Sequence, residues 1–212
     1  LAEPVLRRFE NPWQLPALPA VAGQHSAPDD EGGSFNVDFH WVGIEARLAG
    51  TVVHRWLQYA AEGSVQLASD SLVGLRGVSE RWLREAGVSE AVLESIWERV
   101  NAALQAVLDD ERGAWLLDGD GAAELALTGS VDGRLHSIVI DRVRIDDNGT
   151  HWIVDYKTST HEGGDLPGFL QAESDRYRAQ LRKYAHLYSA YSGAQPKCAL
   201  YFPLLRAFVE VA

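Results

Sequence analysis

The chain has 212 residues, of which 46% are hydrophobic, and its 30 acidic against 19 basic residues give a formal net charge of −11. This hydrophobic content is enough for a folded domain with a sizeable core and excludes a disordered chain. The acidic balance counts against a protein that coats nucleic acid through a broad basic surface, and the single cysteine excludes a disulfide framework or a four-cysteine iron–sulfur cluster.

Residues 1–42 have the composition of a linker or approach segment. Four prolines (Pro4, Pro12, Pro16 and Pro19) interrupt the first part, and residues 29–33 are acidic and glycine-rich. There is no signal peptide and no apolar run long enough to span a bilayer, so we expect a cytoplasmic protein without membrane contact. The chain starts at Leu1 and has no methionine, from which we expect a piece of a longer polypeptide.

A helical pattern covers residues 43–62, where Leu48, Val52 and Leu57 are among the apolar positions. Gly50 and His54 lie one turn apart on the same face of this helix. A neutral imidazole is a competent metal ligand, so His54 is a candidate for one. The alternative is an ordinary helix histidine that is exposed to water or paired with a carboxylate.

Residues 63–111 are predicted to be an all-helical insertion, and Ser89 marks the start of one helix. Its apolar stripe is ordinary core, to which we assign no chemistry; the stripe comprises Val92, Ile96, Val100, Leu104 and Leu108. A strand is expected over 122–129. Glu124 alternates there with apolar residues. We favour a solvent-facing charge, and the alternative is a further polar contributor to the site.

Two β-rich runs, 138–145 and 151–157, flank Asn148-Gly149, a dipeptide that favours a tight hairpin turn. Asp141 lies within the apolar part of the first run, and Asp155 and Lys157 end the second. Strict strand alternation and pairing predict that these three charged residues share one face of the sheet. Since burying an unpaired carboxylate is costly, a divalent cation between Asp141 and Asp155 would account for both.

A long helix is expected over 168–192, and Gln180 and Tyr184 lie one turn apart on it. The basic residues Arg176, Arg178, Arg182 and Lys183 make this the most basic stretch of an acidic chain. Such a run is ordinarily a solvated helix face. The alternative is a strip that follows one phosphate backbone while Tyr177 and Tyr184 stack on bases. Strands over 197–202 and 207–211 are predicted to complete the sheet as a second hairpin.

These elements resemble the PD-(D/E)xK nuclease superfamily, in particular the nuclease domains of RecB- and AddA-type helicase–nucleases. The resemblance covers residues 43–212 and rests on four elements in order: Gly50…His54, Asp141, Asp155-Tyr156-Lys157 and Gln180…Tyr184. In that family the first aspartate usually follows a Gly-x-Ile/Val-Asp string, which Asp132 fits better than Asp141. We favour Asp141, because it reaches Asp155 through one short hairpin, while Asp132-Gly133 makes an ordinary turn.

The resemblance implies a restriction-endonuclease-like α/β fold, a mixed central sheet flanked by helices. It implies Mg²⁺ or Mn²⁺ held by His54, Asp141, Asp155 and the Tyr156 carbonyl, with Asp141, Asp155, Lys157 and Gln180 as catalytic residues. Substrate binding falls to Tyr177, Arg178, Arg182 and Tyr184. The implied activity is hydrolysis of DNA phosphodiester bonds in repair and recombination. The narrow basic strip, which can follow one phosphate backbone but cannot wrap a duplex, leads us to expect single-stranded DNA as the substrate.

The implied partners are helicase motor domains in the same longer polypeptide and a second helicase–nuclease subunit. The chain itself contains no Gly-x-x-x-x-Gly-Lys-Ser/Thr phosphate loop, so a motor would lie outside it. A different class of function is an inactive module of the same fold that binds DNA or a protein, because fold does not settle function.

Overall fold

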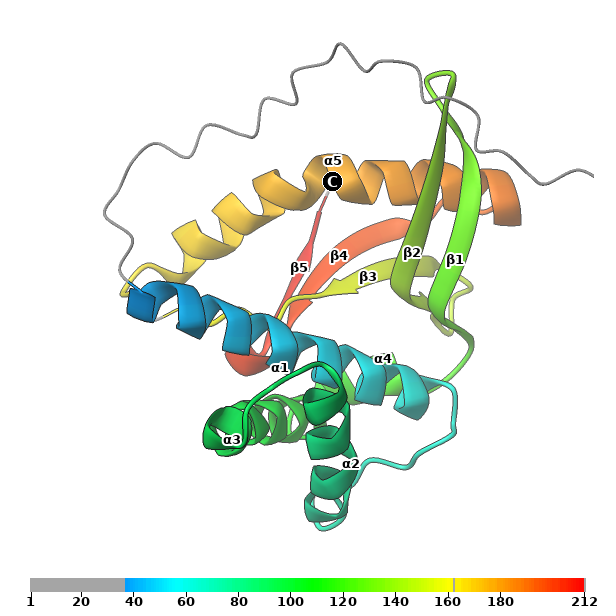
Figure 1. Ribbon diagram of the computed structural model, residues 1–212. Helices are drawn as coiled ribbons and strands as arrows, with labels where there is room; N and C mark the ends of the chain where they lie inside the picture. The colour runs from blue at the N-terminus through cyan, green and yellow to red at the C-terminus, as the bar shows by residue number, and fades with distance from the viewer. Residues whose placement is uncertain (1–36, 162, 212) are drawn as a thin grey trace, which may run out of the picture. The chain divides into compact units, whose positions relative to one another are not determined.

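The computed structural model describes residues 37–161 and 163–211, with side chains from Gly43 onward, and its centre is a five-stranded sheet (Figure 1). The strands β1 (Gly121–Val131), β2 (Arg134–Ile145), β3 (His151–Tyr156), β4 (Lys197–Phe202) and β5 (Ala207–Glu210) lie in sequence order. Neighbours are antiparallel except β3 and β4, which are parallel because helix α5 (Leu166–Ser192) crosses over between them. The predicted mixed α/β sheet is thereby confirmed.

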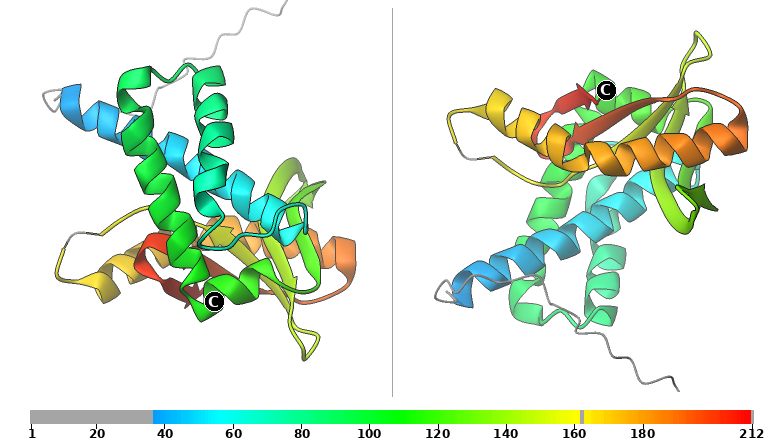
Figure 2. Two further views of the ribbon diagram at one scale, coloured as in Figure 1. Left: turned by 90° about the horizontal axis from the view of Figure 1, so that it is seen from below. Right: turned by 90° about the horizontal axis from the view of Figure 1, so that it is seen from above.

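Helices cover both faces of the sheet (Figure 2). On one face lie α1 (Val37–Ala61), α2 (Leu72–Glu85), α3 (Glu90–Leu108) and α4 (Glu111–Leu117), and on the other lies α5. A short 3₁₀ turn, Pro203–Leu205, joins β4 to β5. No helix in the described part of the chain is long and apolar enough to cross a membrane.

The core divides into two clusters because strand residues alternate between the faces. Val154 and Tyr201 pack with Trp56 of α1 and Ile96 of α3 on the four-helix side. The second cluster lies against α5, and its buried strand residues are Ile140, Val143, Ile153, Cys198, Leu200 and Phe202. Burial raises the pKa of the Cys198 thiol to about 11, as expected for a core cysteine without an ionised role.

The predicted elements are present, with shifted boundaries. Helix α1 begins at Val37 rather than at residue 43, and residues 1–36 of the expected linker lie outside the described residues. The helical stretch 63–111 contains α2 and α3, and Ser89 directly precedes α3 as predicted. Helix α4 was not predicted, because seven residues are too few to show a helical period.

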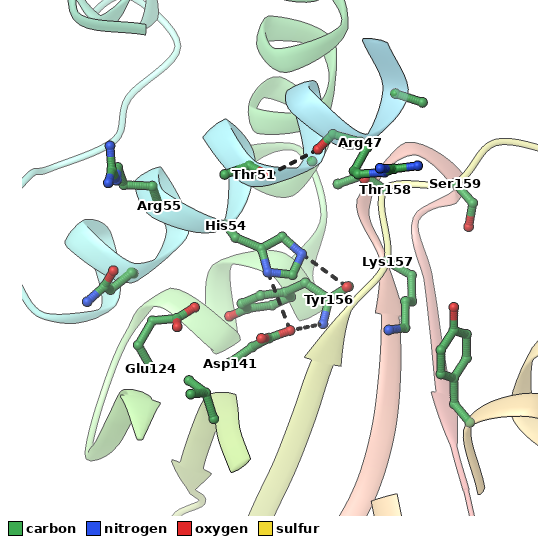
Figure 3. A pocket seen from close by; sticks show the side chains of 15 residues that line it. Arg47, Thr51, His54, Arg55, Glu124, Asp141, Tyr156, Lys157, Thr158 and Ser159 are labelled. Atoms are coloured by element: carbon green, nitrogen blue, oxygen red, sulfur yellow. Dashed lines mark hydrogen bonds and ion pairs between the residues drawn. The ribbon is translucent and has the colours of Figure 1, made fainter. Parts of the chain in front are cut away.

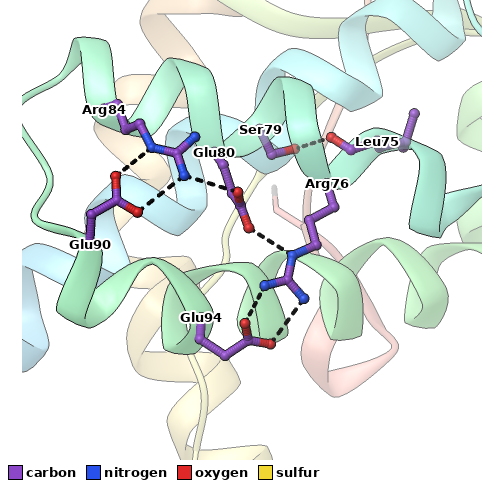
Figure 4. A network of polar contacts seen from close by, with 7 residues as sticks. All are labelled: Leu75, Arg76, Ser79, Glu80, Arg84, Glu90 and Glu94. Carbon is purple, nitrogen blue, oxygen red and sulfur yellow. Dashed lines mark hydrogen bonds and ion pairs between the residues drawn. The ribbon is translucent and has the colours of Figure 1, made fainter.

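An ion-pair network joins α2 to α3 on the surface (Figure 4). Arg76 pairs with Glu80 and Glu94, and Arg84 pairs with Glu80 and Glu90. Exposed pairs of this kind stabilise a fold only weakly. The network nevertheless neutralises the charges of Arg76 and Arg84. These two arginines are therefore not available to bind an anionic ligand.

Two tyrosines on neighbouring strands give a matched test of a buried hydroxyl. Tyr156 and Tyr201 are register partners, and both are buried. The Tyr201 hydroxyl donates to Asp110 Oδ2 at 2.7 Å, whereas the Tyr156 hydroxyl has no hydrogen-bond partner among the described residues. Tyr201→Phe should lower the free energy of unfolding by about 1 kcal/mol, while Tyr156→Phe should leave it unchanged or raise it. Urea unfolding measures both, and an equal loss in the two variants would contradict the assignment.

Candidate active site

The site forms where β2 and β3 stop pairing. The ladder between these strands ends at Arg142↔Val154, so the backbone amide of Tyr156 has no partner from β2. The carboxylate of Asp141 takes that place, because its Oδ2 accepts a hydrogen bond from Tyr156 N at 2.8 Å. A side chain therefore replaces a ladder bond, and the Asp141 carboxylate is fixed between the two strands (Figure 3).

Helix α1 brings His54 onto this carboxylate. His54 Nδ1 lies 3.5 Å from Asp141 Oδ2, and its Nε2 lies 3.1 Å from the Tyr156 carbonyl oxygen. The imidazole also makes an edge contact with the Tyr156 ring, at 5.7 Å between centroids. His54, Asp141 and the Tyr156 carbonyl, three of the predicted metal ligands, thus lie together as expected.

Glu124 of β1 does not have the solvent-facing position that the sequence analysis favoured, and takes the alternative place beside the site. It faces the site cavity rather than bulk solvent, and it stands opposite Asp141 between the register pairs Ala123↔Arg142 and Leu125↔Ile140. Its backbone has a φ of 48°, a left-handed conformation that few residues other than glycine adopt. A carboxylate oxygen of Glu124, a carboxylate oxygen of Asp141 and a ring nitrogen of His54 lie within 4.8 Å of one another.

Asp155, near the end of β3, and Lys157, directly after the strand, lie on the α5 side of the site. Asp155 is 5% exposed; its Oδ1 accepts from Gln180 Nε2 at 2.9 Å, and its Oδ2 lies 2.6 Å from Lys157 Nζ. Gln180 Nε2 also donates to the Tyr184 hydroxyl at 2.9 Å. The ammonium of Lys157 lies 3.7 Å from the centroid of the Tyr177 ring, a cation–π contact. These side chains hold Asp155 and Lys157 in one geometry.

The expectation that Asp141, Asp155 and Lys157 share one face of the sheet holds for Asp155 and Lys157, which form an ion pair, and is wrong for Asp141. Asp141 contacts His54 on the α1 side, whereas Asp155 contacts Gln180 on the α5 side. The reason is a break in alternation, since Asp141 and Arg142 both turn to the four-helix side although they are consecutive. The two carboxylates are still close enough that the charge of Asp141 acts on Asp155.

Electrostatics in the site favour bound protons. Burial raises the pKa of Asp155, and the charge of Asp141 raises it further against the opposing effect of Lys157. Burial and the Asp141 charge likewise raise the pKa of Glu124. For His54, burial lowers the pKa, but its hydrogen bond to Asp141 and the surrounding carboxylates outweigh this and raise it. The cluster carries more negative charge than its surroundings offset, which a cation would relieve.

The cavity beside these residues is open and has a volume of about 720 Å³. His54, Glu124, Asp141, Tyr156 and Lys157 line it, together with residues on one face of α1. The predicted substrate residues Arg178 and Arg182 lie elsewhere, in two hollows that share no residue with this cavity. The cavity contains Tyr177, but its ring is held against Lys157, so base stacking by Tyr177 stays a prediction.

Comparison with known protein families identifies the family of this chain. A sequence profile described as the PD-(D/E)XK nuclease superfamily matches residues 42–210. The chain belongs to the PD-(D/E)XK nuclease superfamily. No curated protein matches the chain.

A solved structure supports the same fold for this PD-(D/E)XK domain. The domain is similar to the crystal structure of a "Putative exonuclease" from Eubacterium rectale, with a TM-score of 0.53 and 16% sequence identity. The match covers 79% of this chain and 59% of that chain. At this identity the likeness shows the fold alone. The restriction-endonuclease-like α/β arrangement is thus shown.

The donor set of this PD-(D/E)XK domain fits a hard divalent cation. Glu124 and Asp141 offer carboxylate oxygens that lie within 4.8 Å of each other and of a His54 ring nitrogen, and the Tyr156 carbonyl oxygen faces His54 Nε2. Oxygen-rich sets suit Mg²⁺, and one imidazole is compatible with Mn²⁺. Asp155 lies behind this group, and its buried Oδ2 makes no hydrogen bond of normal geometry among the described residues, only the ion pair with Lys157.

Glu124 should contribute to Mn²⁺ affinity as Asp141 does. We expect Glu124→Gln and Asp141→Asn each to weaken Mn²⁺ binding at least about tenfold, the effect typical of a lost metal-site contact. Asp132→Asn is the matched control, because Asp132 lies exposed in the β1–β2 turn, with a φ of 50°. Isothermal titration with MnCl₂ measures all three. An affinity that falls in Asp132→Asn and not in Glu124→Gln would refute this ligand set.

Gly50 allows α1 to approach the segment after β3. A Cβ at Gly50 would lie 2.7 Å from Thr158 Oγ1, closer than normal contact. Gly50→Ala should therefore displace α1 and reduce stability, although alanine is intrinsically favoured over glycine in a helix by about 1 kcal/mol. In the Thr158→Ala background the same change should stabilise the domain. Thermal unfolding of the two single variants and the double variant completes the cycle, and additive effects would contradict the close contact.

Proposed function

We propose that this domain is a divalent-metal-dependent nuclease that hydrolyses phosphodiester bonds in DNA. The observation that carries the proposal is the convergence of His54, Glu124, Asp141 and the Tyr156 carbonyl beside Lys157, in an open cavity. The match to the PD-(D/E)XK superfamily supports the reaction class. We propose Mg²⁺ or Mn²⁺ as the cofactor, held by these groups with Asp155 as a further carboxylate.

A bound divalent cation supplies Lewis-acid stabilisation of charge on the phosphate and activates water at neutral pH. The chain's own residues do the rest. The ammonium of Lys157, fixed by Asp155 and the Tyr177 ring, donates hydrogen bonds to the attacking water or to a phosphate oxygen. Gln180 positions Asp155 through its amide, and Tyr184 positions Gln180. Catalysis in this arrangement depends on geometry fixed before the substrate arrives.

We propose single-stranded DNA as the substrate, because a chain of net charge −11 has too little positive surface to wrap a duplex. The order of the motifs from Gly50…His54 to Gln180…Tyr184 supports a role as the nuclease part of a RecB/AddA-like helicase–nuclease, working with motor domains and a second subunit. DNA repair or recombination in the cytoplasm is the corresponding setting.

Lys157 separates catalysis from metal binding. Lys157→Ala should abolish cleavage of labelled single-stranded DNA in MgCl₂ while leaving Mn²⁺ binding largely intact, because Lys157 donates and does not ligate. Asp155→Ala should also abolish cleavage, but with weaker Mn²⁺ binding. Gel-resolved cleavage together with metal titration measures both effects. A wild-type protein that binds DNA and never cuts it would instead indicate an inactive binding module, and full activity in Lys157→Ala would refute the assigned role.

A further inference from the structure

We infer that the DNA strand lies along α1, with phosphates bound by Arg47 and Arg55 on the two sides of the metal-binding residues. This inference rests on the proposed function and adds the residues that hold the substrate. It differs from the sequence-based interpretation, which placed the phosphate contacts on α5. Both arginines lie beside the site cavity, have no carboxylate partner among the described residues, and are well separated along the helix.

Arg47 and Arg55 both line the site cavity, together with Thr51 and His54 of the same helix. In Figure 3 they lie on opposite sides of His54, with Arg47 towards Thr158 and Ser159 and Arg55 on the side of Glu124. The acidic residues of the cavity, Glu124 and Asp141, lie between them. Positive charge therefore flanks the candidate cation site at both ends.

Most other cations of the described chain are already paired. Those with a carboxylate partner outside the cavity are Arg76, Arg84, Arg176, Arg178, Lys197 and Arg206. Others donate to backbone carbonyls, as the buried Arg142 and Arg144 do. By contrast, the structure gives the guanidiniums of Arg47 and Arg55 no carboxylate partner among the described residues. Arg55 only lies over the Trp82 ring, at 4.6 Å.

The unpaired state of these two arginines is informative in this chain. Carboxylates outnumber basic residues, 30 to 19, and an arginine on such a surface is easily paired. Among the described cations without a carboxylate partner, Arg47 and Arg55 are the two that line the site cavity, so their charge is available there for an anionic ligand. Arg side chains are suited to phosphate because their planar fork of donors matches two phosphate oxygens.

The spacing of the two arginines points to a strand and not to a single nucleotide. They are eight residues apart, which places their Cα atoms about 12 Å from each other along the helix at 1.5 Å per residue. One phosphate group cannot occupy both ends of that interval and the metal site at once. A polynucleotide can, with one phosphate at the reacting position and others beside Arg47 and Arg55.

DNA binding, measured apart from cleavage, tests the inference. Fluorescence anisotropy of a labelled single strand is followed across a salt series in EDTA, so that the strand is not consumed. Each lost phosphate contact on a single strand reduces the slope of log affinity against log salt by about 0.7. Arg47→Ala/Arg55→Ala should therefore flatten the slope by about 1.4, and Arg47→Lys/Arg55→Lys should keep most of it. Arg81→Ala/Arg134→Ala, which removes two exposed arginines outside the cavity, is the charge-matched control.

Three outcomes decide the question. A slope that flattens in Arg47→Ala/Arg55→Ala and stays unchanged in the control supports α1 as the strand's path, even if the wild type never cuts DNA. Equal flattening in the control, or flattening only in Arg178→Ala/Arg182→Ala, overturns it.

Discussion

One hydrogen bond, from the Tyr156 amide to the Asp141 carboxylate, defines the centre of this molecule. It closes the end of the β2–β3 ladder with a side chain where a backbone carbonyl would ordinarily accept. The Asp141 carboxylate is thereby held between two strands, and the Tyr156 carbonyl on the same residue is left to face His54. His54 of α1 contacts both this carboxylate and this carbonyl, so the three potential metal ligands have fixed positions. The binding geometry follows from a local defect in the sheet.

That defect is maintained by the next residue of β2. Arg142 is 1% exposed, and its guanidinium donates to the Leu116 carbonyl at 2.7 Å and to the carbonyls of Asp118 and Gly119 at 3.2 Å. These carbonyls lie at the end of α4, where helix carbonyls lack partners within the helix. Satisfying them holds Arg142 on the four-helix side of the sheet, the side to which Asp141 also turns. Helix α4 thus contributes to the site without touching it, by fixing the direction of one strand residue.

Much of the fold followed from sequence because its signals are local. Asn148-Gly149 indicated the β2–β3 hairpin, and the apolar period indicated α1 and α3. The site was harder, because strict alternation was assumed for β2, which conceals that Asp141 and Arg142 share a side. The place of Glu124 in the site was the less favoured alternative for a similar reason, although a turn at Asp132-Gly133 already sets residue 124 opposite residue 141 in the β1–β2 register. The irregular backbone that turns these two carboxylates together depends on tertiary contacts to α1 and α4, which no local pattern records.

Helices α5 and α1, the two long helices beside the site, have different roles. The difference explains how a chain of net charge −11 could bind a polyanion such as DNA. Helix α5 holds the catalytic side chains in place. A continuous series of contacts begins and ends on this helix and runs through Tyr184, Gln180, Asp155, Lys157 and Tyr177. The carboxylates Glu173 and Asp175 neutralise its arginines Arg176 and Arg178, and its other cations, Arg182 and Lys183, lie outside the site cavity. Helix α1 instead presents unpaired arginines on the cavity side. Because electrostatic attraction to a strand acts within about 10 Å at ordinary salt, a few well-placed cations matter more there than net charge.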